Sequence, residues 1–539
     1  MTRPGRRCLN PESMRKLLIL AAALLSAACA EAPQPEINVI PRPLSVEQGD
    51  GTFRLGRSCP IGYDDPALQS VAALCAGYLT EEGERKPVVA DKPVHKGIDL
   101  QLDDTLAGEE YTLSATKKGV SICGGSPRAV LYGVQTLRQL IDGDRVPVVE
   151  IRDEPYFGYR GAMFDVARYF YPVEEVKRFI DIMALHKLNT FHWHLTDDQG
   201  WRIEIKRYPE LTRIGSQRRE TLIGHYKTSD EYDGKPHGGY YTQDEIREVV
   251  AYAAERCIDI IPEIELPGHS MAALASYPWL GCTKGPYEVR TTWYYSSDVL
   301  CAGRETTFEF LENVLTEVLG LFPSKYIHVG GDECPKVRWK ACPDCQRRMH
   351  REGLADEDAL QSYFVCRIEK WLHAHGREMI GWDELLEGGV TPSTIVMSWR
   401  GTEGGIEAAK LGNRVIMAPR FYFYLDYYQT SDPEKNGEPL SIGRNVPIRK
   451  LYGYDPFDRL DEAQSRNILG VQANLWTEYI STMDHAEYML LPRLAAMSEV
   501  AWATERRDYD DFVHRLGSLR GLYDREGYRY ADFVFRGIE

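Results

Sequence analysis

"YIHVGGDECP", residues 326–335, joins a short apolar run to two glycines and two adjacent acids. The run Tyr326–Val329 is typical of a buried strand that glycine brings to an end. Two glycines in a row leave room for another group to approach the backbone. Asp332 and Glu333 follow directly, and adjacent side chains on an extended chain point to opposite faces. The stretch therefore predicts a strand that ends in two carboxylates with different directions.

Seven further apolar runs share this pattern, and each is followed by a helical pattern. In chain order the eight runs are "YRGAMFDVA" (159), "NTFHWHL" (189), "CIDIIPEIEL" (257), "YIHVGG" (326), "REMIGW" (377), "TIVMSW" (394), "NRVIMAP" (413) and "ILGVQANLW" (468). Eight strand–helix units predict an α/β fold, the (β/α)8 TIM barrel, for which about 250 residues is typical. Because this region is longer, we expect long loops within residues 201–256 and 420–467.

A smaller unit precedes the predicted barrel. Apolar and polar residues alternate in 97–102, 109–115 and 119–123, which predicts strands. Ser126 and Pro127 then suit the cap and the first position of a helix. We predict a signal peptide in 1–30, a small α+β domain with a proline-rich linker in 31–155, and a catalytic barrel with a C-terminal helix in 156–539.

The first thirty residues indicate export. Arg15 and Lys16 precede the apolar stretch "LLILAAALLSAACA", residues 17–30, in the order of a secretory signal. "SAAC", which ends at Cys29, resembles a lipoprotein processing site, and cleavage after Ala30 is the alternative. We expect an exported protein, either periplasmic or anchored as an outer-membrane lipoprotein.

Composition limits the partners of the chain. The 539 residues are 43% hydrophobic and 27% charged, as in folded globular proteins. The formal net charge of −16 disfavours nucleic acid as a partner. No stretch after the leader approaches the roughly 20 continuous apolar residues of a membrane span.

Twelve cysteines raise the question of disulfides and metals. Export permits disulfides, and Cys282 with Cys301 is a reasonable pair. "CPDC", residues 342–345, is half of a zinc pattern, but no second CxxC occurs in the chain. We therefore expect a tight disulfide or two free thiols there, and no structural zinc.

The residues that close the eight runs suggest the chemistry, since barrel enzymes place their active sites at the C-terminal ends of the strands. These residues are Asp165, Arg168, His192, His194, Asp197, Asp198, Glu263, Glu265, His269, Asp332, Glu333, Trp382, Asp383, Glu384, Trp399, Arg400, Tyr424, Asp426, Trp476 and Glu478. Acids and tryptophans dominate. His192-x-His194 is compatible with a metal, but no second histidine pair follows, so we expect hydrogen bonds to neighbouring loops and no metal. The acids near the last two strands disfavour a phosphate site.

Carboxylates with aromatic walls fit a neutral sugar, and the reaction class is then glycosidic cleavage. Retaining enzymes usually need two carboxyl groups about 5 Å apart, and inverting enzymes about 6.5–9.5 Å. Asp332 and Glu333 do not clearly offer such a pair across one bond. Either a distant acid such as Glu384 or Glu478 completes the pair, or the substrate supplies the nucleophile.

The chain resembles glycoside hydrolase family 20, the β-N-acetylhexosaminidases. The matching segments are "RGAMFDVAR", "LNTFHWHLTDDQGWRIEI", "PEIELPGHS", "HVGGDE", "GWDE", "SWRG", "YLDY" and "LWTE", in that order, and "EEYTL" with "LYGVQTLRQL" resembles the small N-terminal domain of the family. The resemblance implies release of terminal β-linked GlcNAc or GalNAc from glycans without a cofactor, through attack by the 2-acetamido oxygen. A two-carboxylate retaining glycosidase and a non-catalytic glycan-binding barrel remain the alternatives.

The resemblance also implies a role for each site residue. Glu333 is the general acid and then the base, Asp332 orients the acetamido nitrogen, and Tyr424 donates to the acetamido oxygen. The remaining expected residues are Trp382, Trp399 and Trp476 as pocket walls, Arg160, Asp426 and Glu478 as ligands of sugar hydroxyls, and Asp198 and His269 behind the acid.

Overall fold

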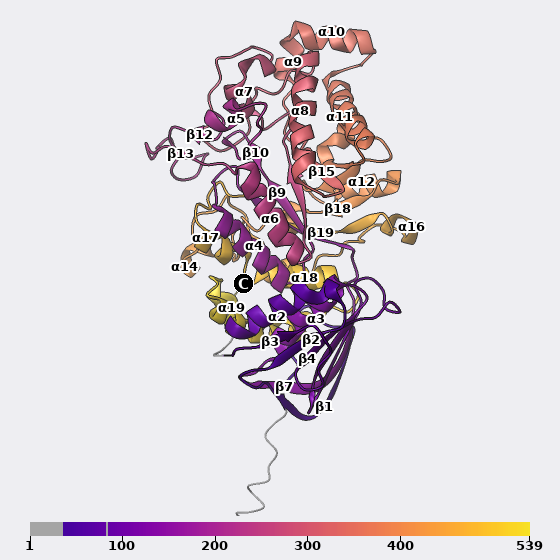
Figure 1. Cartoon of the computed structure of the whole chain (residues 1–539). Coiled ribbons are helices and arrows are strands. Elements are labelled where there is room, and N and C mark those ends of the chain that lie inside the picture. Colours follow the sequence, from indigo (N-terminus) through magenta and orange to yellow (C-terminus); the bar gives the residue numbers. More distant parts are fainter. Residues whose placement is uncertain (1–35, 82–84, 539) are drawn as a thin grey trace, which may run out of the picture.

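The computed structural model describes residues 36–81 and 85–538 of the chain (Figure 1). The predicted signal peptide, with Cys29, lies outside the described residues. The larger part is a closed barrel, and a smaller domain built on a sheet lies below it in the view of Figure 1.

The barrel consists of the eight strands that the apolar runs predict, and every neighbouring pair is parallel. They are β8 (Tyr159–Asp165), β9 (Thr190–His194), β14 (Asp259–Glu263), β15 (Tyr326–His328), β16 (Glu378–Trp382), β17 (Ile395–Ser398), β18 (Val415–Met417) and β19 (Ile468–Leu475). β19 pairs with β8 and closes the ring. The predicted α/β fold class is therefore confirmed.

Helices surround the barrel, and one connection differs from the expected pattern. The main helices are α4 (Val173–Leu185), α6 (Gln243–Glu255), α8 (Glu305–Leu321), α11 (Glu357–Ala374), α12 (Glu403–Leu411), α17 (Met483–Leu490), α18 (Arg493–Trp502) and α19 (Tyr509–Glu526). β16 and β17 are joined instead by a 3-10 helix, η3 (Asp383–Gly388). The twelve residues between these strands leave too little chain for a full crossover helix and its loops.

The long connections expected in 201–256 and 420–467 hold only short elements besides α6. These are β11 (Gly200–Trp201), α5 (Glu210–Arg213), β12 (Gln217–Arg218), β13 (His237–Gly238), α13 (Arg420–Phe423), α14 (Pro433–Asn436), α15 (Ile448–Tyr452) and α16 (Glu462–Ser465). Further short elements near the barrel rim are β10 (Thr196–Asp197), α7 (Met271–Ser276), η2 (Pro278–Leu280), α9 (Val337–Ala341) and α10 (Pro343–Glu352).

The small domain is a seven-stranded mixed sheet of order β1-β7-β5-β6-β4-β2-β3 with two helices on one face. Its elements are β1 (Ser45–Arg54), β2 (Pro60–Tyr63), α2 (Gln69–Glu81), β3 (Val88–Ala90), β4 (Ile98–Leu102), β5 (Tyr111–Thr116), β6 (Gly119–Gly124), α3 (Pro127–Leu140) and β7 (Arg145–Asp153). Ser126 accepts a hydrogen bond from the Ala129 N–H and caps α3, as its sequence predicts. Both helices lie between the sheet and the barrel (Figure 1).

A buried polar contact joins the two parts. Asp153, at the end of β7, accepts hydrogen bonds from the Tyr111 hydroxyl at 2.7 Å and the Trp502 indole N–H at 2.9 Å. The Lys187 ammonium lies 3.3 Å from the same carboxylate. Since Lys187 and Trp502 belong to the barrel, this contact fixes the sheet domain against the N-terminal ends of the barrel strands.

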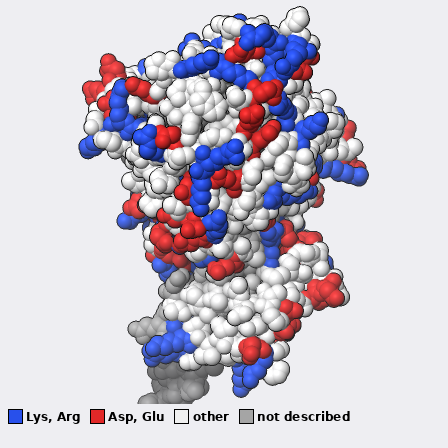
Figure 2. Space-filling model, turned by 45° about the horizontal axis from the view of Figure 1, so that its top comes forward, with Lys and Arg blue, Asp and Glu red and all other residues white. Residues whose placement is uncertain are grey.

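The surface carries acidic and basic side chains side by side on the face drawn in Figure 2. Among the described residues, no helix is both long and apolar enough to cross a membrane.

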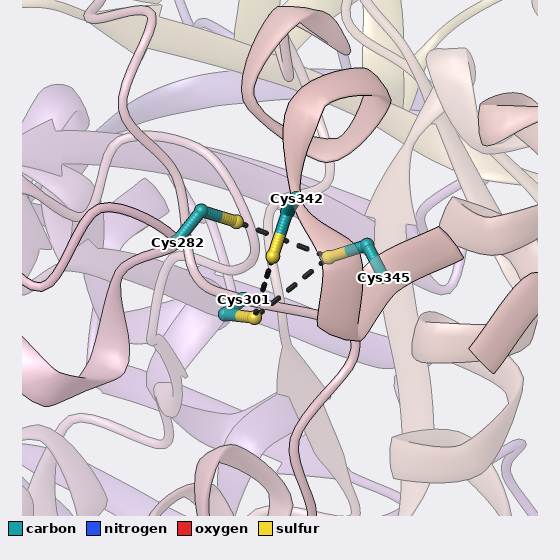
Figure 3. Close-up of side chains that lie close together, drawn as sticks. All are labelled: Cys282, Cys301, Cys342 and Cys345. Carbon is teal, nitrogen blue, oxygen red and sulfur yellow. Dashed lines mark hydrogen bonds between the residues drawn. The ribbon is translucent and has the colours of Figure 1, made fainter. Parts of the chain in front are cut away.

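The described cysteines form no disulfide, and the pair expected between Cys282 and Cys301 is absent. Both residues instead belong to a group of four thiols completed by Cys342 and Cys345 (Figure 3).

Candidate active site

A pocket of about 310 Å³ opens at the C-terminal end of the barrel, where the (β/α)8 fold places its chemistry. It is lined by Arg168, Tyr226, Lys227, His269, Trp293, Tyr294, Tyr295, Asp332, Glu333, Trp399, Arg420, Tyr424, Asp426, Tyr427, Ile442, Gly443, Arg444, Trp476 and Glu478. Four carboxyl groups, one imidazole and several aromatic rings therefore face one small volume.

Asp332 and Glu333 meet at one imidazole. Each has a carboxylate oxygen 3.5 Å from Nε2 of His269. The expectation of an extended chain is wrong here, because β15 ends at His328 and Glu333 has a φ of 41°, in the left-handed region. Asp332 is buried, whereas the Glu333 side chain is 35% exposed. The two acids thus differ in their access to solvent rather than by facing opposite sides of a strand.

The buried site shifts the pKa of Asp332. Burial raises the pKa of its carboxyl to about 6, while the nearby His269 opposes this rise. One of its oxygens has no hydrogen-bond partner among the described residues. A buried, unpartnered carboxylate oxygen in a pocket is a ready acceptor for an N–H group of a ligand.

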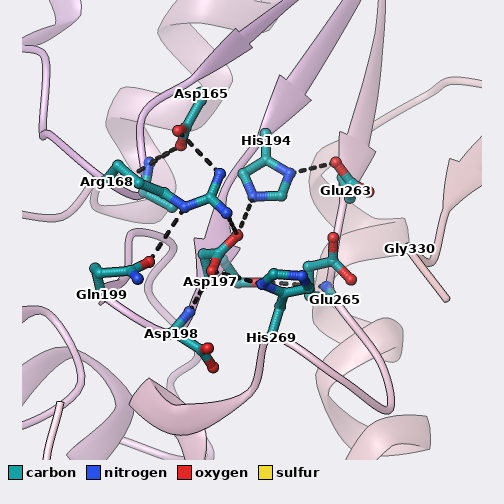
Figure 4. A network of polar contacts seen from close by, with 12 residues as sticks. Asp165, Arg168, His194, Asp197, Asp198, Gln199, Glu263, Glu265, His269 and Gly330 are labelled. Atoms are coloured by element: carbon teal, nitrogen blue, oxygen red, sulfur yellow. Dashed lines mark hydrogen bonds and ion pairs between the residues drawn. The ribbon is translucent and has the colours of Figure 1, made fainter. Parts of the chain in front are cut away.

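His269 is held from behind by Asp197 (Figure 4). Asp197 Oδ1 accepts from His269 Nδ1 at 3.0 Å, and Oδ2 lies 2.8 Å from the Arg168 guanidinium. Burial lowers the pKa of His269, but the carboxylates of Asp197 and Asp332 outweigh it and raise that pKa well above its usual value. The imidazole is therefore a cation beside the two acids.

Asp198, which we expected behind the acid, lies beside His269 and Asp197, and polar atoms of the three side chains are within 4.8 Å of one another. Its carboxylate accepts hydrogen bonds from the backbone N–H groups of Met271 and Ser296, each at 3.0 Å, and it does not line the pocket. Asp197, which we did not expect in this role, makes the direct hydrogen bond to His269. The sequence "TDDQG" does not distinguish the roles of Asp197 and Asp198, because it does not show which side chain points toward His269.

Three histidines under the pocket share one carboxylate. His192 and His328 approach Glu263 at 2.9 Å and 2.7 Å, and His194 also bonds to it. Burial raises the pKa of Glu263, but the three imidazoles overcome this effect and lower it well below its usual range. We expected hydrogen bonds from His192 and His194 to neighbouring loops, but the shared partner, Glu263, ends strand β14, and His194 also reaches Asp197 beyond β9 at 2.9 Å.

The prediction for Arg160 was wrong. Arg160 is the second residue of β8, at the opposite end of the barrel from the pocket, and its side chain is fully buried. It pairs with Glu109 at 2.9 Å and donates to the backbone carbonyls of Phe157 and Lys187. Its function is to join the barrel to the small domain.

Arg168 lines the pocket in its place. Asp165 at 3.2 Å, Asp197 at 2.8 Å and Gln199 at 3.1 Å hold its guanidinium (Figure 4). Arg168 is already among the residues that close the runs, three positions beyond the end of β8. The rule that chemistry lies at the C-terminal strand ends distinguishes it from Arg160.

Aromatic rings wall the pocket around Asp332. Tyr424 stacks nearly parallel with Trp399, with ring centroids 6.1 Å apart, and lies 6.2 Å from Trp476. Trp382 is buried and donates its indole N–H to Glu263 at 3.0 Å. It lies behind Trp476, at 6.0 Å between centroids, and is not among the lining residues. Trp382 therefore supports the wall from behind.

Asp426 and Glu478 form a second pair of acids. Burial raises the pKa of Asp426 well above its usual value, and the neighbouring Glu478 raises it further. Burial also raises the pKa of Glu478, against the opposing charge of Arg168. Carboxyl oxygens accept hydrogen bonds and the arginine donates them, so the group can serve both the hydrogens and the oxygens of sugar hydroxyls.

The loops add lining residues that the strand pattern did not predict. Tyr226, Trp293, Tyr294 and Tyr295 come from the connections after β9 and β14, and Arg420 and Arg444 come from the connection after β18. These segments have no strand or helix period, so periodicity does not single them out. The aromatic cluster "TTWYY", residues 291–295, is the one sequence signal that points to them.

A parallel barrel whose pocket gathers acids, an imidazole and indole rings at the strand ends is typical of a glycoside hydrolase. The chain belongs to glycosyl hydrolase family 20. The model of the family's catalytic domain matches residues 157–505, and that of its domain 2 matches residues 36–154.

Known relatives agree with this assignment. A β-hexosaminidase of Porphyromonas gingivalis is 44% identical over 95% of this chain and 67% of its own length. A β-hexosaminidase of Vibrio furnissii is 39% identical over 86% of this chain and 76% of its own.

Solved structures share the fold over most of the chain. One is an exo β-N-acetylglucosaminidase of Vibrio harveyi in complex with N-acetylglucosamine, with a TM-score of 0.82 and 34% identity, covering 93% of this chain and 79% of that one. Another is an N-acetyl-β-hexosaminidase of Streptomyces plicatus in complex with Thio-NAglucal, with a TM-score of 0.81 and 32% identity, covering 93% and 97%.

Proposed function

We propose that this chain is an exo-acting β-N-acetylhexosaminidase that releases terminal β-linked GlcNAc or GalNAc with retention of configuration. The observation that carries the proposal is the pairing of Asp332 and Glu333 on one imidazole within an aromatic pocket. Because both acids approach the same nitrogen, they lie on one side of the pocket. A nucleophile and an acid in a two-carboxylate enzyme instead flank the bond that breaks.

The first step is an intramolecular nucleophilic attack within the substrate. The 2-acetamido oxygen forms a bond to the anomeric carbon while the glycosidic C–O bond breaks. Glu333 gives its proton to the leaving oxygen, and its 35% exposed side chain suits contact with a leaving group and water. The leaving alcohol departs, and a cyclic oxazolinium remains in the pocket.

Asp332 acts on the acetamido group. As the oxygen attacks, positive charge develops on the acetamido nitrogen. The unpartnered oxygen of Asp332 accepts the N–H and offsets this charge, since a fixed anion in a buried site stabilises a developing cation. Tyr424 donates to the acetamido oxygen, and its place between Trp399 and Trp476 holds the planar group in the attacking orientation.

In the second step water opens the intermediate. The Glu333 carboxylate takes a proton from a water molecule, whose oxygen bonds to the anomeric carbon as the bond to the acetamido oxygen breaks. The sugar leaves with its original configuration after two inversions, and Glu333 holds its proton again.

His269 is a positioning residue. Its positive charge lowers the pKa of Asp332, which favours the ionised carboxylate that the nitrogen requires. Arg168, Asp426 and Glu478 bind the hydroxyls of the terminal sugar. A pocket of about 310 Å³, at the small end of ligand sites, suits one sugar ring and hence an exo-acting enzyme.

A panel of aryl glycosides tests the proposal. We expect release of the aryl group from β-GlcNAc or β-GalNAc substrates and almost none from β-glucoside. Turnover of the β-glucoside at a similar rate would favour a two-carboxylate glycosidase, and binding without turnover would favour a glycan-binding barrel.

Export is also a proposal. Residues 1–30 have the charge and apolar pattern of a secretory signal, and Cys29 follows a box that resembles a lipoprotein site. Cell fractionation of the wild type and of Cys29→Ala tests both parts. Uncut chain in the cytoplasm contradicts export, and unchanged membrane association of the variant contradicts lipidation.

A further inference from the structure

Four cysteine sulfurs come together outside the residues that line the pocket. Cys282 Sγ lies 3.8 Å from Cys345 Sγ, and Cys301 Sγ lies 3.8 Å from Cys342 Sγ and 3.7 Å from Cys345 Sγ (Figure 3). All four sulfurs lie within 4.8 Å of one another. The geometry points to a structural zinc site formed by these four cysteines, independent of the proposed enzymatic function.

The sulfur separations have the size that zinc requires. Zn–S bonds of about 2.3 Å in a regular tetrahedron give S–S edges of about 3.8 Å. A disulfide instead needs sulfurs about 2.05 Å apart. Cys301 is equally close to Cys342 and to Cys345, so no single pairing is preferred. Four nearly equivalent sulfurs favour a shared metal ion over two separate bonds.

The fold supplies the second half of the metal pattern that the sequence lacks. Cys342 and Cys345 form the CxxC half at the start of α10. Cys282 and Cys301 are far apart in sequence, but an antiparallel bridge between Gly281 and Leu300 brings them together at the base of one loop. We expected no zinc because the sequence has no second CxxC. The bridge at the base of the loop brings Cys282 and Cys301 together and supplies the second pair of ligands.

A helix N-terminus and an arginine side chain lie beside the four sulfurs. Cys342 is the N-cap of α10, where the helix dipole stabilises negative charge. The Arg304 side chain donates to the backbone carbonyls of Cys282 and Gly281 and pairs with Asp344, between the two CxxC ligands. This cation offsets the net negative charge of a zinc ion with four thiolates. Cys301, Cys342 and Cys345 are buried, which suits a closed structural site.

The site links two segments that reach the pocket. The loop closed by Cys282 and Cys301 carries Trp293, Tyr294 and Tyr295, which line the pocket. The CxxC turn follows Glu333 after α9, so zinc would fix both segments to each other. We therefore expect loss of the metal to raise KM more than it lowers kcat. The aromatic residues of the loop contact the sugar, whereas Asp332 and Glu333 are held by the barrel just after β15.

Metal and thiol analysis of the whole exported protein, purified without chelator or added metal, is the test. We expect about one zinc per chain and no disulfide among these cysteines by mass spectrometry after alkylation under denaturing conditions. A chain without zinc, or disulfides joining these four cysteines, would overturn the proposal.

Variants identify the ligands. Zinc content should fall at least about tenfold in Cys301→Ser and Cys345→Ser, because removal of one thiolate opens the site. Cys366→Ser is the matched control, since Cys366 lies on α11 outside the group, and it should keep its zinc. Full zinc in either cluster variant would assign the metal to another site and contradict the proposal. Wild-type metal analysis decides the matter even if a variant fails to fold.

Discussion

The protonation state of Asp332 should control the rate of the reaction at low pH. Burial raises its pKa to about 6, so the carboxylate should be half protonated near pH 6 rather than near pH 4, where an unperturbed aspartate titrates. We expect kcat/KM to fall below about pH 6, because protonated Asp332 cannot offset the charge on the acetamido nitrogen. In His269→Gln this limb should move to higher pH, since His269 lowers the pKa of Asp332. A pH profile with an aryl β-GlcNAc substrate measures both, and an unmoved limb in the variant would contradict the coupling.

Glu333 should matter in proportion to the basicity of the leaving group. Glu333→Gln removes proton transfer, which typically costs about 10²–10⁴-fold in rate. The loss should be largest for a disaccharide and smallest for an aryl glycoside with an acidic phenol, which serves as the internal control. Cleavage of the disaccharide at the wild-type rate would show that another group is the acid.

The backbone just after β15 takes a left-handed conformation that glycine allows. Gly330 has a φ of 67°, and an added Cβ would overlap the carboxylate of Glu265. We expect Gly330→Ala to lower the free energy of unfolding by more than the roughly 1–2 kcal/mol that a left-handed alanine costs alone. Activity should also fall by about 10²-fold, the usual effect of an ångström-sized displacement of catalytic groups.

Gly412→Ala is the control for that variant. Gly412 has a φ of 90° at the end of α12, but no atom lies near the position of an added Cβ. Gly412→Ala should lower the free energy of unfolding only by the roughly 1–2 kcal/mol that a left-handed alanine costs, and it should keep its activity. Thermal unfolding and initial rates compare the two, and equal effects would show that the overlap with Glu265 is unimportant.

The strands could be read from the sequence because buried parallel strands are continuous apolar runs, as "TIVMSW" and "NRVIMAP" show. Residues that directly follow such runs, including Asp332, Glu333 and Trp476, were placed correctly at the pocket for the same reason. The loop residues were missed because irregular segments have no period. The four-cysteine group was missed because a loop closure, not a local spacing, brings Cys282 to Cys301.

Arg160 shows how a local motif can mislead when the strand direction is ignored. Both arginines of "RGAMFDVAR" lie on or after β8, but they lie at opposite ends of the barrel. Strand polarity decides between them, since only the C-terminal end carries the site.

Arg160 makes a second buried contact between the barrel and the small domain, beside that of Asp153. Arg160→Met removes one of the two arginine partners of Glu109 and leaves two backbone carbonyls without their donor, so it should cost about 2–6 kcal/mol of stability, at about 1–3 kcal/mol for each carbonyl. KM of the folded fraction should not change. Arg168→Met should do the opposite and raise KM, because Arg168 lines the pocket. Chemical denaturation with steady-state kinetics separates the two, and a raised KM in Arg160→Met would contradict the structural role.

The central claim is that the acetamido oxygen of the substrate is the nucleophile. Replacing the acetyl hydrogens with one, two and three fluorines withdraws electrons from that oxygen with little change in size, so rates measured along this series test the claim most directly. We predict a steep fall in kcat/KM with each fluorine, and a weaker dependence in Asp332→Asn, which no longer stabilises the charge on the nitrogen. A flat series, together with a sugar ester on a carboxylate of the pocket detected by mass spectrometry, would contradict it.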